Sequence, residues 1–446
     1  MINRKLEKEL DAWSRNPNRK PLIIRGARQV GKTTLVRKFA SKFAVFLQLN
    51  LELADDFVIF ERTDNVHQAL DAIYLHNRKT KQEESTLLFI DEIQQSAKAV
   101  AMLRYFYEEY PELHVVVASS LLETLLDKRQ ISFPVGRVEF LSLRPCNFLE
   151  FLDGMNEHFD ANLIVEMAAT PVHERVMKLF NAYTIIGGMP AAIMQYAQKR
   201  DILSVSPVYE SLLVSYREDA EKYASTDTVL RAIRHILDVG WRYAGDVVAF
   251  ERFGGSAFKS REMGEAFRTI EKALLLELVY STSETRLPVL PNLRRKPKLV
   301  WLDTGLVNYV AGIQTELFTA SDIIDTWRGR IAEHIAAQEL IGLTDRVSAQ
   351  RFFWRRDKAG SEAEVDFVFP FNGKLIPIEV KSGHNAHLRS LHRFMEAAPH
   401  NVAIRVWSQP YSVDSATTPR GKVFTIINLP FYYLCVLPHI LQENGV

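Results

Sequence analysis

The sequence has little cysteine and no excess of charge of either sign. Its 446 residues include two cysteines, Cys146 and Cys435, which lie far apart and form no C-x-x-C pair. This usage excludes a disulfide framework or a cysteine-rich zinc site and fits a reducing cytosol. The formal net charge is +1 at pH 7. No bulk field therefore attracts nucleic acid or anionic lipid, and any basic surface has to be local.

Long apolar segments are also missing. The longest one near the carboxyl end, 429–441, is interrupted by prolines and is too short to cross a bilayer. Acids and bases mix in the first eight residues and no apolar stretch follows them, so we expect no secretion signal. We therefore predict a cytoplasmic protein with no membrane partner. A chain of 446 residues is too long for one ordinary core and predicts about three domains.

A glycine-rich segment near the amino end carries the strongest signal. Residues 26–33 spell G-A-R-Q-V-G-K-T, which is the G-x-x-x-x-G-K-[ST] pattern of a P-loop. The apolar run before it predicts a strand, and 35–40 predicts a helix. Backbone N–H groups can surround a polyphosphate only where side chains do not intrude, which explains the glycines. The helix points its positive dipole end at the anion. The pattern predicts an ATP site.

The residue types within this loop predict their roles. Lys32 would neutralise the β- and γ-phosphates as a catalytic residue, and the Thr33 hydroxyl would be a Mg²⁺ ligand. Together the loop would wrap the triphosphate. The residues predicted to bind ATP are Gly26, Ala27, Arg28, Gln29, Val30, Gly31, Lys32, Thr33 and Thr34.

Two acids end a second apolar run, 86–92, which predicts a buried strand. Asp91 would hold the hydrated Mg²⁺, and Glu92 would polarise the attacking water as the catalytic base. Further buried strands are predicted at 44–50 and 114–118. Because these strands alternate with helices, we predict an α/β fold with a parallel sheet covered on both faces.

Two serines follow the strand predicted at 114–118. Ser119 or Ser120 has the short polar side chain that could reach the γ-phosphate and sense it, and we include Ser119 among the predicted catalytic residues. Serines at this place also cap the start of a helix. The sequence leaves both interpretations open.

The order of these motifs resembles the AAA+ superfamily. The resemblance rests on the P-loop, Leu-Leu-Phe-Ile-Asp-Glu at 87–92, Val-Ala-Ser-Ser at 117–120, Val-Gly-Arg-Val at 135–138 and Leu-Arg-Pro-Cys-Asn-Phe-Leu-Glu-Phe at 143–151. More narrowly, the chain is similar to bacterial and archaeal AAA+ ATPases that carry a C-terminal domain of uncharacterised function. That family usually has Gly-Ser where this chain has Ala118-Ser119.

The resemblance implies a homo-oligomeric ring, with a hexamer as the expected size. AAA+ sites are completed by an arginine of the neighbouring subunit, which stabilises charge on the transferred phosphoryl group. Arg137 is the candidate by its position in the family pattern, and Arg129 stands behind it. The alternative is that Arg137 is a surface residue paired with a local acid.

The middle of the chain is predicted to be helical. Residues 151–225 fit the helical lid that follows AAA+ cores, with a break at 186–190 that the family shares. Helices are then predicted at 229–238 and 260–280, followed by a strand-like pair around 290–301. Helix, turn, helix and a basic hairpin outline a winged helix.

This winged-helix candidate contains a local concentration of basic residues. Such a cluster is where phosphate contacts with DNA would gather in a protein of near-zero net charge. A winged helix used only for packing, with a solvated basic turn, is the alternative. The predicted DNA contacts are Lys259, Arg261, Arg268, Arg294, Arg295 and Lys296.

The C-terminal part predicts a second site. Strands at 364–369 and 375–381 flank an Asn-Gly turn, so a hairpin brings Asp366 beside Glu379 and Lys381. Two carboxylates beside a lysine suit a divalent cation, Mg²⁺ or Mn²⁺, with Lys381 helping to activate water for attack on a phosphodiester. Glu333, on a helix predicted at 327–340, would add a third oxygen.

This pattern resembles the PD-(D/E)xK restriction-endonuclease-like superfamily. A helix at 386–395 and a strand at 402–407 fit the α/β core of that fold. The resemblance implies Asp366, Glu379 and Lys381 as catalytic residues and Glu333, Asp366 and Glu379 as metal ligands. The same fold also serves as a DNA-binding or oligomer-forming module.

Together these patterns predict four domains and two candidate functions. The first function is a DNA-acting ATPase that remodels or translocates on duplex or branched DNA, with the C-terminal domain binding or cutting it. The second is an ATP-driven switch or scaffold, in signalling or defence, whose nuclease-like domain is inert. The predicted domains are an ATPase core at 1–150, a helical lid at 151–225, a winged helix at 226–315 and a nuclease-like domain at 320–446.

Overall fold

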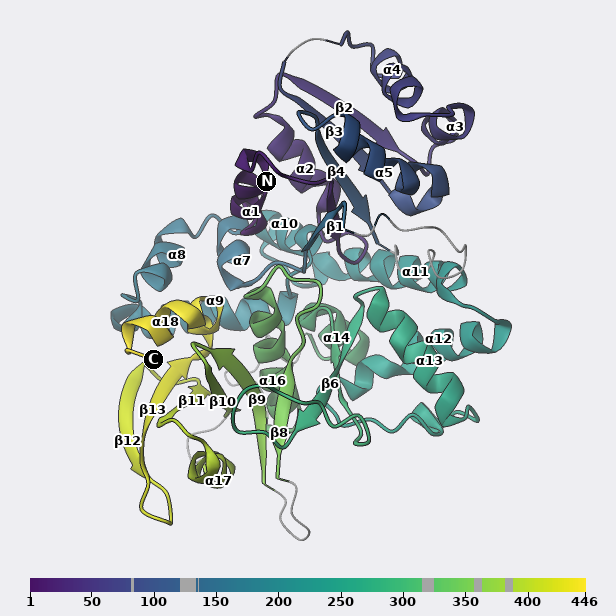
Figure 1. Ribbon diagram of the computed structural model, residues 1–446. Coiled ribbons are helices and arrows are strands. Elements are labelled where there is room, and N and C mark those ends of the chain that lie inside the picture. Colours follow the sequence, from purple (N-terminus) through teal and green to yellow (C-terminus); the bar gives the residue numbers. More distant parts are fainter. Residues whose placement is uncertain (82–83, 121–133, 135, 315–324, 357–362, 382–387) are drawn as a thin grey trace.

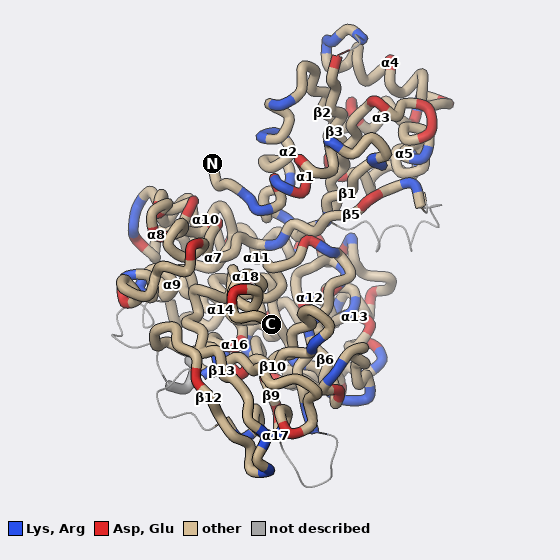
Figure 2. The backbone as a smooth tube through the Cα atoms, turned by 60° about the vertical axis from the view of Figure 1, so that its left-hand side comes forward, with Lys and Arg blue, Asp and Glu red and all other residues tan. Residues whose placement is uncertain are grey.

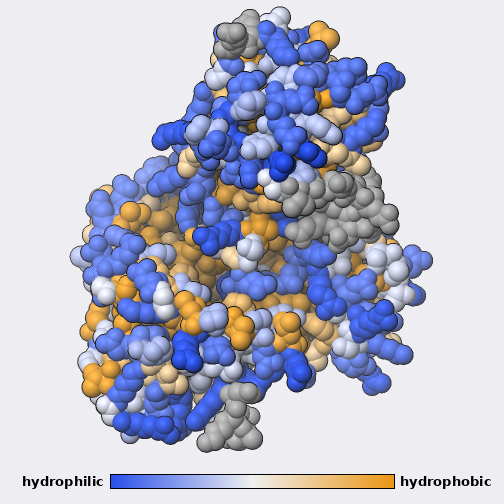
Figure 3. All heavy atoms as spheres, in the orientation of Figure 1, coloured by the Kyte–Doolittle hydropathy of each residue, from blue (hydrophilic) through white to orange (hydrophobic). Residues whose placement is uncertain are grey.

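The computed structural model describes residues 1–81, 84–120, 134, 136–314, 325–356, 363–381 and 388–446. The amino-terminal part forms the upper lobe in Figure 1, middle helices lie beneath it, and the C-terminal strands lie at the bottom. Most of the face in Figure 3 is hydrophilic, and apolar side chains show in the recess beneath the upper lobe. No helix of the described residues is long and apolar enough to cross a membrane.

A parallel sheet covered by helices forms the upper lobe. Its strands, in order across the sheet, are β2 (Val45–Asn50), β3 (Thr86–Asp91), β4 (His114–Ser119), β1 (Leu22–Arg25) and β5 (Glu139–Ser142). Its helices are α1 (Leu6–Arg15), α2 (Lys32–Ala40), α3 (Ala54–Arg62), α4 (Val66–His76) and α5 (Ala97–Glu109).

Apolar side chains cover both faces of this sheet. Those of α1 and α2 belong to one buried cluster, and those of α3, α4 and α5 belong to another. Strand β3 is buried at every position, as its continuous apolar sequence requires. The predicted α/β fold with a parallel sheet is therefore confirmed.

Helices follow the sheet through the segment predicted as a lid and into the predicted winged helix. These helices fill the middle of the molecule (Figure 1). They are α7 (Phe148–Gly154), α8 (His158–Val165), α9 (His173–Ile186), α10 (Pro190–Lys199), α11 (Ser206–Tyr223), α12 (Asp227–Val239), α13 (Ser260–Lys272) and α14 (Thr304–Ala311).

Two boundaries in the predicted winged helix are wrong. Helix α13 ends at Lys272, and the residues that follow form strand β6 (Leu276–Thr282) instead of more helix. Leu274 has a left-handed backbone with φ of 60°, which stops the helix. The strand-like pair predicted around 290–301 is a single strand, β7 (Lys298–Trp301), and its partner is β6. Prolines at 288, 291 and 297 remove backbone donors from the connection between them.

Two segments that carry the family resemblance, 143–151 and 186–190, meet a third segment, 301–306, in the middle of the molecule. The Cys146 N–H donates to Gly188 O (2.7 Å), which joins the segment after β5 to the break between α9 and α10. The Gly188 N–H donates to Asp303 Oδ2 (2.5 Å). Asp303 also caps α14 by accepting from Leu306 N–H (3.0 Å). We call residues 143–151, 186–190 and 301–306 together the motif hub.

Glycines allow the close contacts of the motif hub. A Cβ atom added at Gly305 would lie 2.1 Å from Ile186 O, and one at Gly188 would lie 2.2 Å from Cys146 O. Gly187 has a φ of 74° and ends helix α9. Only glycine fits these backbone approaches, so Gly187, Gly188 and Gly305 have a structural role in this chain.

A mixed sheet forms the lower part of the molecule. It also contains β6 and β7, so the strands of the predicted winged helix continue into the C-terminal sheet. In order across the sheet, its strands are β12 (Ser412–Thr417), β13 (Val423–Pro430), β11 (Val402–Trp407), β10 (Lys374–Val380), β9 (Glu364–Phe371), β8 (Phe352–Arg355), β6 and β7. Its helices are α16 (Asp325–Gly342), α17 (Arg389–Ala397) and α18 (Leu437–Glu443).

The predicted hairpin of the C-terminal domain is present. Strands β9 and β10 are antiparallel. Asn372 and Gly373, with φ of 43° and 74°, turn between them as the Asn-Gly pair predicts. Residues 386 and 387 of the helix predicted at 386–395 lie outside the described residues, and α17 covers 389–395.

Candidate functional site

The predicted P-loop connects β1 to α2. Gly26 follows β1 directly, and a Cβ atom there would lie 2.5 Å from Leu143 O, so the chain has room only for glycine. Gln29 and Gly31 have left-handed backbones, with φ of 63° and 95°. Helix α2 then begins at Lys32. This strand–loop–helix arrangement is the context that the motif requires.

Lys32 lies inside the loop. Its Nζ donates to Gly26 O and Ala27 O, both at 2.9 Å, and the residue is 6% exposed. Burial lowers the pKa of Lys32, while the carboxylates of Glu92 and Asp91 oppose that shift. The ammonium group is thus positioned where the loop would surround phosphate oxygens. Thr34, also predicted to bind ATP, is exposed on the first turn of α2.

Thr33 and Asp91 are in direct contact. The Thr33 hydroxyl donates to Asp91 Oδ2 (2.6 Å), and the Glu92 N–H donates to Asp91 Oδ1 (3.1 Å). A hydroxyl and a carboxylate oxygen are hard ligands of the kind that Mg²⁺ prefers. The donor set of this pair therefore fits the predicted metal.

Glu92 is held by a network that sequence patterns did not reveal. It has a left-handed backbone (φ 52°). Glu92 Oε2 accepts from Gln94 Nε2 and from the Ser120 hydroxyl (3.3 Å). The buried Ser119 hydroxyl donates to Gln94 Oε1 (2.7 Å), which links Ser119 to Glu92 through Gln94. In the sequence, the polar pair Gln94-Gln95 shortly after Asp91-Glu92 was the feature that could have indicated a side chain orienting Glu92.

The P-loop also contacts the predicted lid. Arg28 forms ion pairs with Glu52 (3.0 Å) and with Asp219 of α11. The Tyr216 hydroxyl, also on α11, donates to Arg28 O (3.4 Å). Asp219 is 3% exposed and lies 3.3 Å from Lys222. A buried acid on α11 thus fixes one side of the loop, and nothing in the local sequence indicated this contact.

Arg137 contacts an acid of its own chain. Its Nε donates to Glu108 Oε1 on α5 (3.0 Å), and its side chain is 42% exposed. Arg104 shares the same carboxylate. This contact matches the alternative of a local surface pair, and the role of Arg137 between subunits stays a prediction. Arg129 lies outside the described residues.

The predicted DNA contacts lie at the surface. Lys259, Arg261, Arg268, Arg294 and Lys296 are exposed, and Arg295 is half-buried. In the part of the chain that the structure describes, those five exposed residues have no ion-pair partner. Figure 2 shows Lys and Arg around α13 and the chain after β6, with acids among them.

The predicted residues of the C-terminal site lie together. The Val380 N–H donates to Asp366 Oδ2 (2.8 Å), and Lys381 Nζ lies 2.7 Å from Glu379 Oε1. Burial raises the pKa of Asp366 well above its ordinary value, and the charges of Glu333 and Glu379 add to the shift. These carboxylates therefore share one buried volume.

Two further residues complete what we call the carboxylate cluster: Glu333, Glu364, Asp366 and Glu379 with Lys298 and Lys381. Lys298 Nζ lies 3.0 Å from Glu333 Oε2 and 2.9 Å from Glu364 Oε1. It also lies 3.8 Å from Asp366 Oδ1. Its side chain is 7% exposed. The sequence predicted no part for Lys298 in this site, although it lies within the strand-like pair expected around 290–301. Strand β7, which begins at Lys298, is buried at every position.

The carboxylate cluster does not fit the predicted metal. The position between Glu333 and Asp366 is already taken by the Lys298 ammonium. Within the described residues, no group of three or more His, Cys, Asp or Glu side chains is arranged to hold a metal ion.

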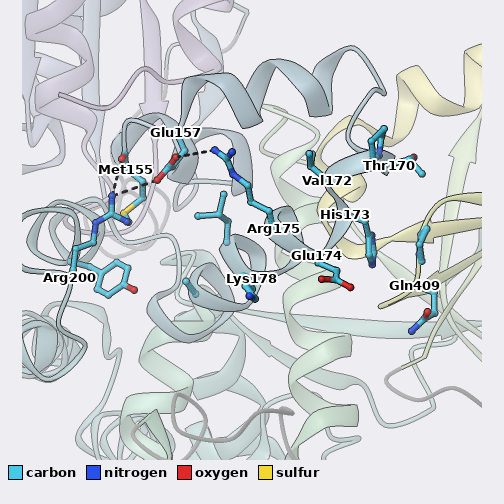
Figure 4. A pocket seen from close by; sticks show the side chains of 15 residues that line it. Met155, Glu157, Thr170, Val172, His173, Glu174, Arg175, Lys178, Arg200 and Gln409 are labelled. Atoms are coloured by element: carbon cyan, nitrogen blue, oxygen red, sulfur yellow. Dashed lines mark hydrogen bonds and ion pairs between the residues drawn. The ribbon is translucent and has the colours of Figure 1, made fainter.

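A large surface cavity of about 990 Å³ lies between α9, α10 and residues 409–410 (Figure 4). Its arginines are already paired. Arg175 lies 2.6 Å from Asp160, and Arg200 lies 3.7 Å from Glu157. No residue of the P-loop or of the carboxylate cluster lines this cavity, so it belongs to neither site.

Comparison with known families assigns a class to the upper lobe. Residues 18–152 match the family described as an AAA domain. The chain therefore carries an AAA-type ATPase domain. Residues 177–317 and 328–432 match two families described as domains of unknown function, DUF8612 and DUF4143. No curated protein matches the chain.

Several solved structures are distantly similar to the chain. The Walker-type ATPase PABY2304 of Pyrococcus abyssi is 15% identical with a TM-score of 0.43, over 70% of this chain and 96% of that one. The Aeropyrum pernix ORC2 protein is 13% identical with a TM-score of 0.31, over 72% and 96% of the two chains. The Drosophila ORC bound to DNA is 12% identical with a TM-score of 0.26, over 69% and 84%.

Proposed function

We propose that this protein hydrolyses ATP and uses the energy to remodel or translocate on duplex or branched DNA. The observation that carries the ATPase part is the contact between Thr33 and Asp91, with Lys32 inside the loop and Glu92 next in the chain. These are the groups that phosphoryl transfer to water needs.

Each side chain of this site has a part in the proposed hydrolysis. Lys32 stabilises negative charge on the β- and γ-phosphates. Thr33 and Asp91 would hold Mg²⁺, which would neutralise phosphate charge when bound. Glu92 accepts a proton from the attacking water. The water oxygen bonds to the γ-phosphorus while the bond from that phosphorus to the β–γ bridging oxygen breaks. Gln94 and Ser120 orient Glu92 for this task.

The DNA part of the proposal is supported by the exposed basic residues of the predicted winged helix. Lys259 and Arg261 lie at the start of α13, and Arg294 and Lys296 lie in the connection before β7. Unpaired exposed cations at these positions suit phosphate contacts. A ring of subunits, a hexamer by resemblance, would let Arg137 of one subunit reach the ATP of the next.

ATP turnover measured with linear, forked and four-way DNA tests this proposal. We expect DNA to stimulate turnover in the wild type, and we expect the Lys32→Ala variant to show no turnover with or without DNA. Wild-type turnover that no DNA changes, together with no retention on DNA, would remove the DNA part. Unchanged turnover in Lys32→Ala would remove the ATPase part.

A second function, an ATP-driven switch or scaffold with an inert C-terminal domain, is favoured by one observation. Lys298 occupies the centre of the carboxylate cluster, where a nuclease would need a metal ion. Plasmid incubated with Mg²⁺ or Mn²⁺ and the wild type, Glu379→Ala or Lys381→Ala discriminates. Cutting by the wild type that both variants lose would exclude the inert version, and no cutting by any protein would favour it.

A further inference from the structure

We propose that the Lys298 ammonium is the permanent cation of the carboxylate cluster and takes the place of a divalent metal. The C-terminal domain then does not cut phosphodiesters. This inference concerns the carboxylate cluster alone, and it stands whether or not DNA is the partner of the ATPase domain.

The distances around Lys298 are those of an ammonium group that three carboxylates surround. Its Nζ has oxygens of Glu333 and Glu364 at 3.0 and 2.9 Å, and an oxygen of Asp366 at 3.8 Å. An ammonium has three protons to donate, and two are used in short charge-assisted bonds. The carboxylates of Glu333, Glu364 and Asp366 point at this one nitrogen, and a second cation would have to share their oxygens with this charge.

The Lys298 side chain is almost completely enclosed. Its side chain is 7% exposed, and Nζ lies 5.0 Å from the centroid of the Phe353 ring on β8. The backbone of Lys298 pairs with Val279 of β6 and forms a bridge with Val247. The ammonium therefore stays in the cluster, because withdrawing it would leave buried carboxylates without their cation.

The second lysine of the cluster is already used. Lys381 Nζ pairs with Glu379 at 2.7 Å, so this acid is neutralised separately from the other three. A nuclease would need Glu379 for a metal ion and Lys381 for a water molecule. In this chain the two side chains contact each other instead.

The contacts of Lys298 indicate a structural purpose. The residue lies on β7, at one end of the C-terminal sheet, while its partners lie on α16 and β9. The cluster therefore joins β7 of the predicted winged helix to helix α16 and strand β9. A nuclease fold would use that helix and that strand for cleavage. We infer that this domain binds or positions a partner, and that it does not hydrolyse phosphodiesters.

Titration of nucleotide-free full-length protein with Mn²⁺, followed calorimetrically, tests the inference without relying on activity. We expect no saturable Mn²⁺ site that depends on Asp366 in the wild type. Lys298→Met removes the internal cation, so we expect it to gain one Mn²⁺ per chain. This site should disappear in the Lys298→Met/Asp366→Asn double variant.

Thermal unfolding gives a second readout and controls. We expect Lys298→Met to unfold at a lower temperature than the wild type and to recover part of the loss when Mn²⁺ or Ca²⁺ is added. Lys381→Met is the matched control and should gain no such metal response. Wild-type protein that binds one Mn²⁺ in a way that Asp366→Asn abolishes and Asp91→Asn preserves would overturn the inference, even if Lys298→Met fails to fold.

Discussion

At the scale of single residues, the ATPase site depends on a few polar contacts with separate tasks. Lys32 and Thr33 come from the P-loop, whereas Asp91 and Glu92 come from the end of β3. Gln94 and Ser120 contact only the Glu92 carboxylate among these four. Binding and proton transfer are therefore separable by mutation.

We predict that Glu92→Gln lowers ATP turnover by about 10²- to 10³-fold while nucleotide binding is kept. The amide keeps the shape of the side chain but cannot accept the proton of the attacking water. Phosphate release and binding of a fluorescent ATP analogue measure the two effects. Turnover in Glu92→Gln at the wild-type rate would show that another group is the base.

A buried glutamate predicts a pH dependence of stability. Burial raises the pKa of Glu339 to about 8, from an ordinary value near 4.5. Glu339 Oε1 accepts from Phe148 N–H (3.1 Å) and Tyr183 OH (2.6 Å), and the buried Oε2 has no hydrogen-bond partner among the described residues. The folded protein therefore keeps the proton between pH 4.5 and 8 while the unfolded chain loses it, and stability falls as pH rises through this window.

We predict that Glu339→Gln removes this part of the pH dependence, because the amide is neutral at every pH. The difference in melting temperature between Glu339→Gln and the wild type should increase from pH 5 to pH 8 and then stay constant. It should reflect a few kcal/mol in the free energy of unfolding. A difference that does not change with pH would mean that Glu339 is ionised in the folded protein.

At the scale of elements, the motif hub joins the ATPase domain to the rest of the chain. Residues 143–151, 186–190 and 301–306 are far apart in sequence, and they meet through Cys146, Gly188 and Asp303. These contacts connect the segment after β5, the break between α9 and α10, and the start of α14. Segments 143–151 and 186–190, on which the resemblance rests, thus act here as packing positions.

We predict that Gly305→Ala lowers the free energy of unfolding by about 3 kcal/mol or more. Its Cβ would lie 2.1 Å from Ile186 O, and neither backbone can move away easily. Gly329→Ala in α16 is the matched control, since a Cβ there meets nothing within 4 Å. The control should change stability by about 1 kcal/mol or less. Equal melting temperatures for the two variants would contradict the role of the hub.

At the scale of the whole molecule, the predicted winged helix and the C-terminal domain share one sheet. Strand β6 pairs in parallel with β8, and β7 closes that end of the sheet. The exposed basic residues of the predicted winged helix and the carboxylate cluster are therefore attached to the same sheet, which we treat as one body. If the ATPase domain moves this body, it moves both together.

We predict that combined charge reversal of Arg261, Arg268 and Lys296 to Glu weakens DNA retention by about tenfold or more and lowers its salt dependence. These exposed side chains are the proposed phosphate contacts. Arg78→Glu/Lys79→Glu changes two exposed bases after α4 and serves as the control. DNA binding at several salt concentrations measures the retention of each variant. Equal loss of retention in both sets of variants would show that only net charge matters.

Much of the ATP site was predictable because its residues are consecutive in the chain. The P-loop and the Asp91-Glu92 pair are short patterns whose spacing follows from backbone geometry. Four members of the carboxylate cluster, Glu333, Asp366, Glu379 and Lys381, were also predictable, since a hairpin and a helix carry them. Gln94 needed the fold of the loop after β3 before its contact with Glu92 was visible.

The sequence by itself determined that this chain has a parallel α/β core and a phosphate-binding loop, because periodicity and glycine spacing act over a few residues. Only the tertiary structure decided that Lys298 enters the carboxylate cluster and that Asp219 reaches the P-loop. The pairs Lys298–Glu364 and Arg28–Asp219 are separated by long stretches of chain. Whether a lysine neutralises buried acids or contacts solvent depends on which strands pair, and local sequence does not encode that choice.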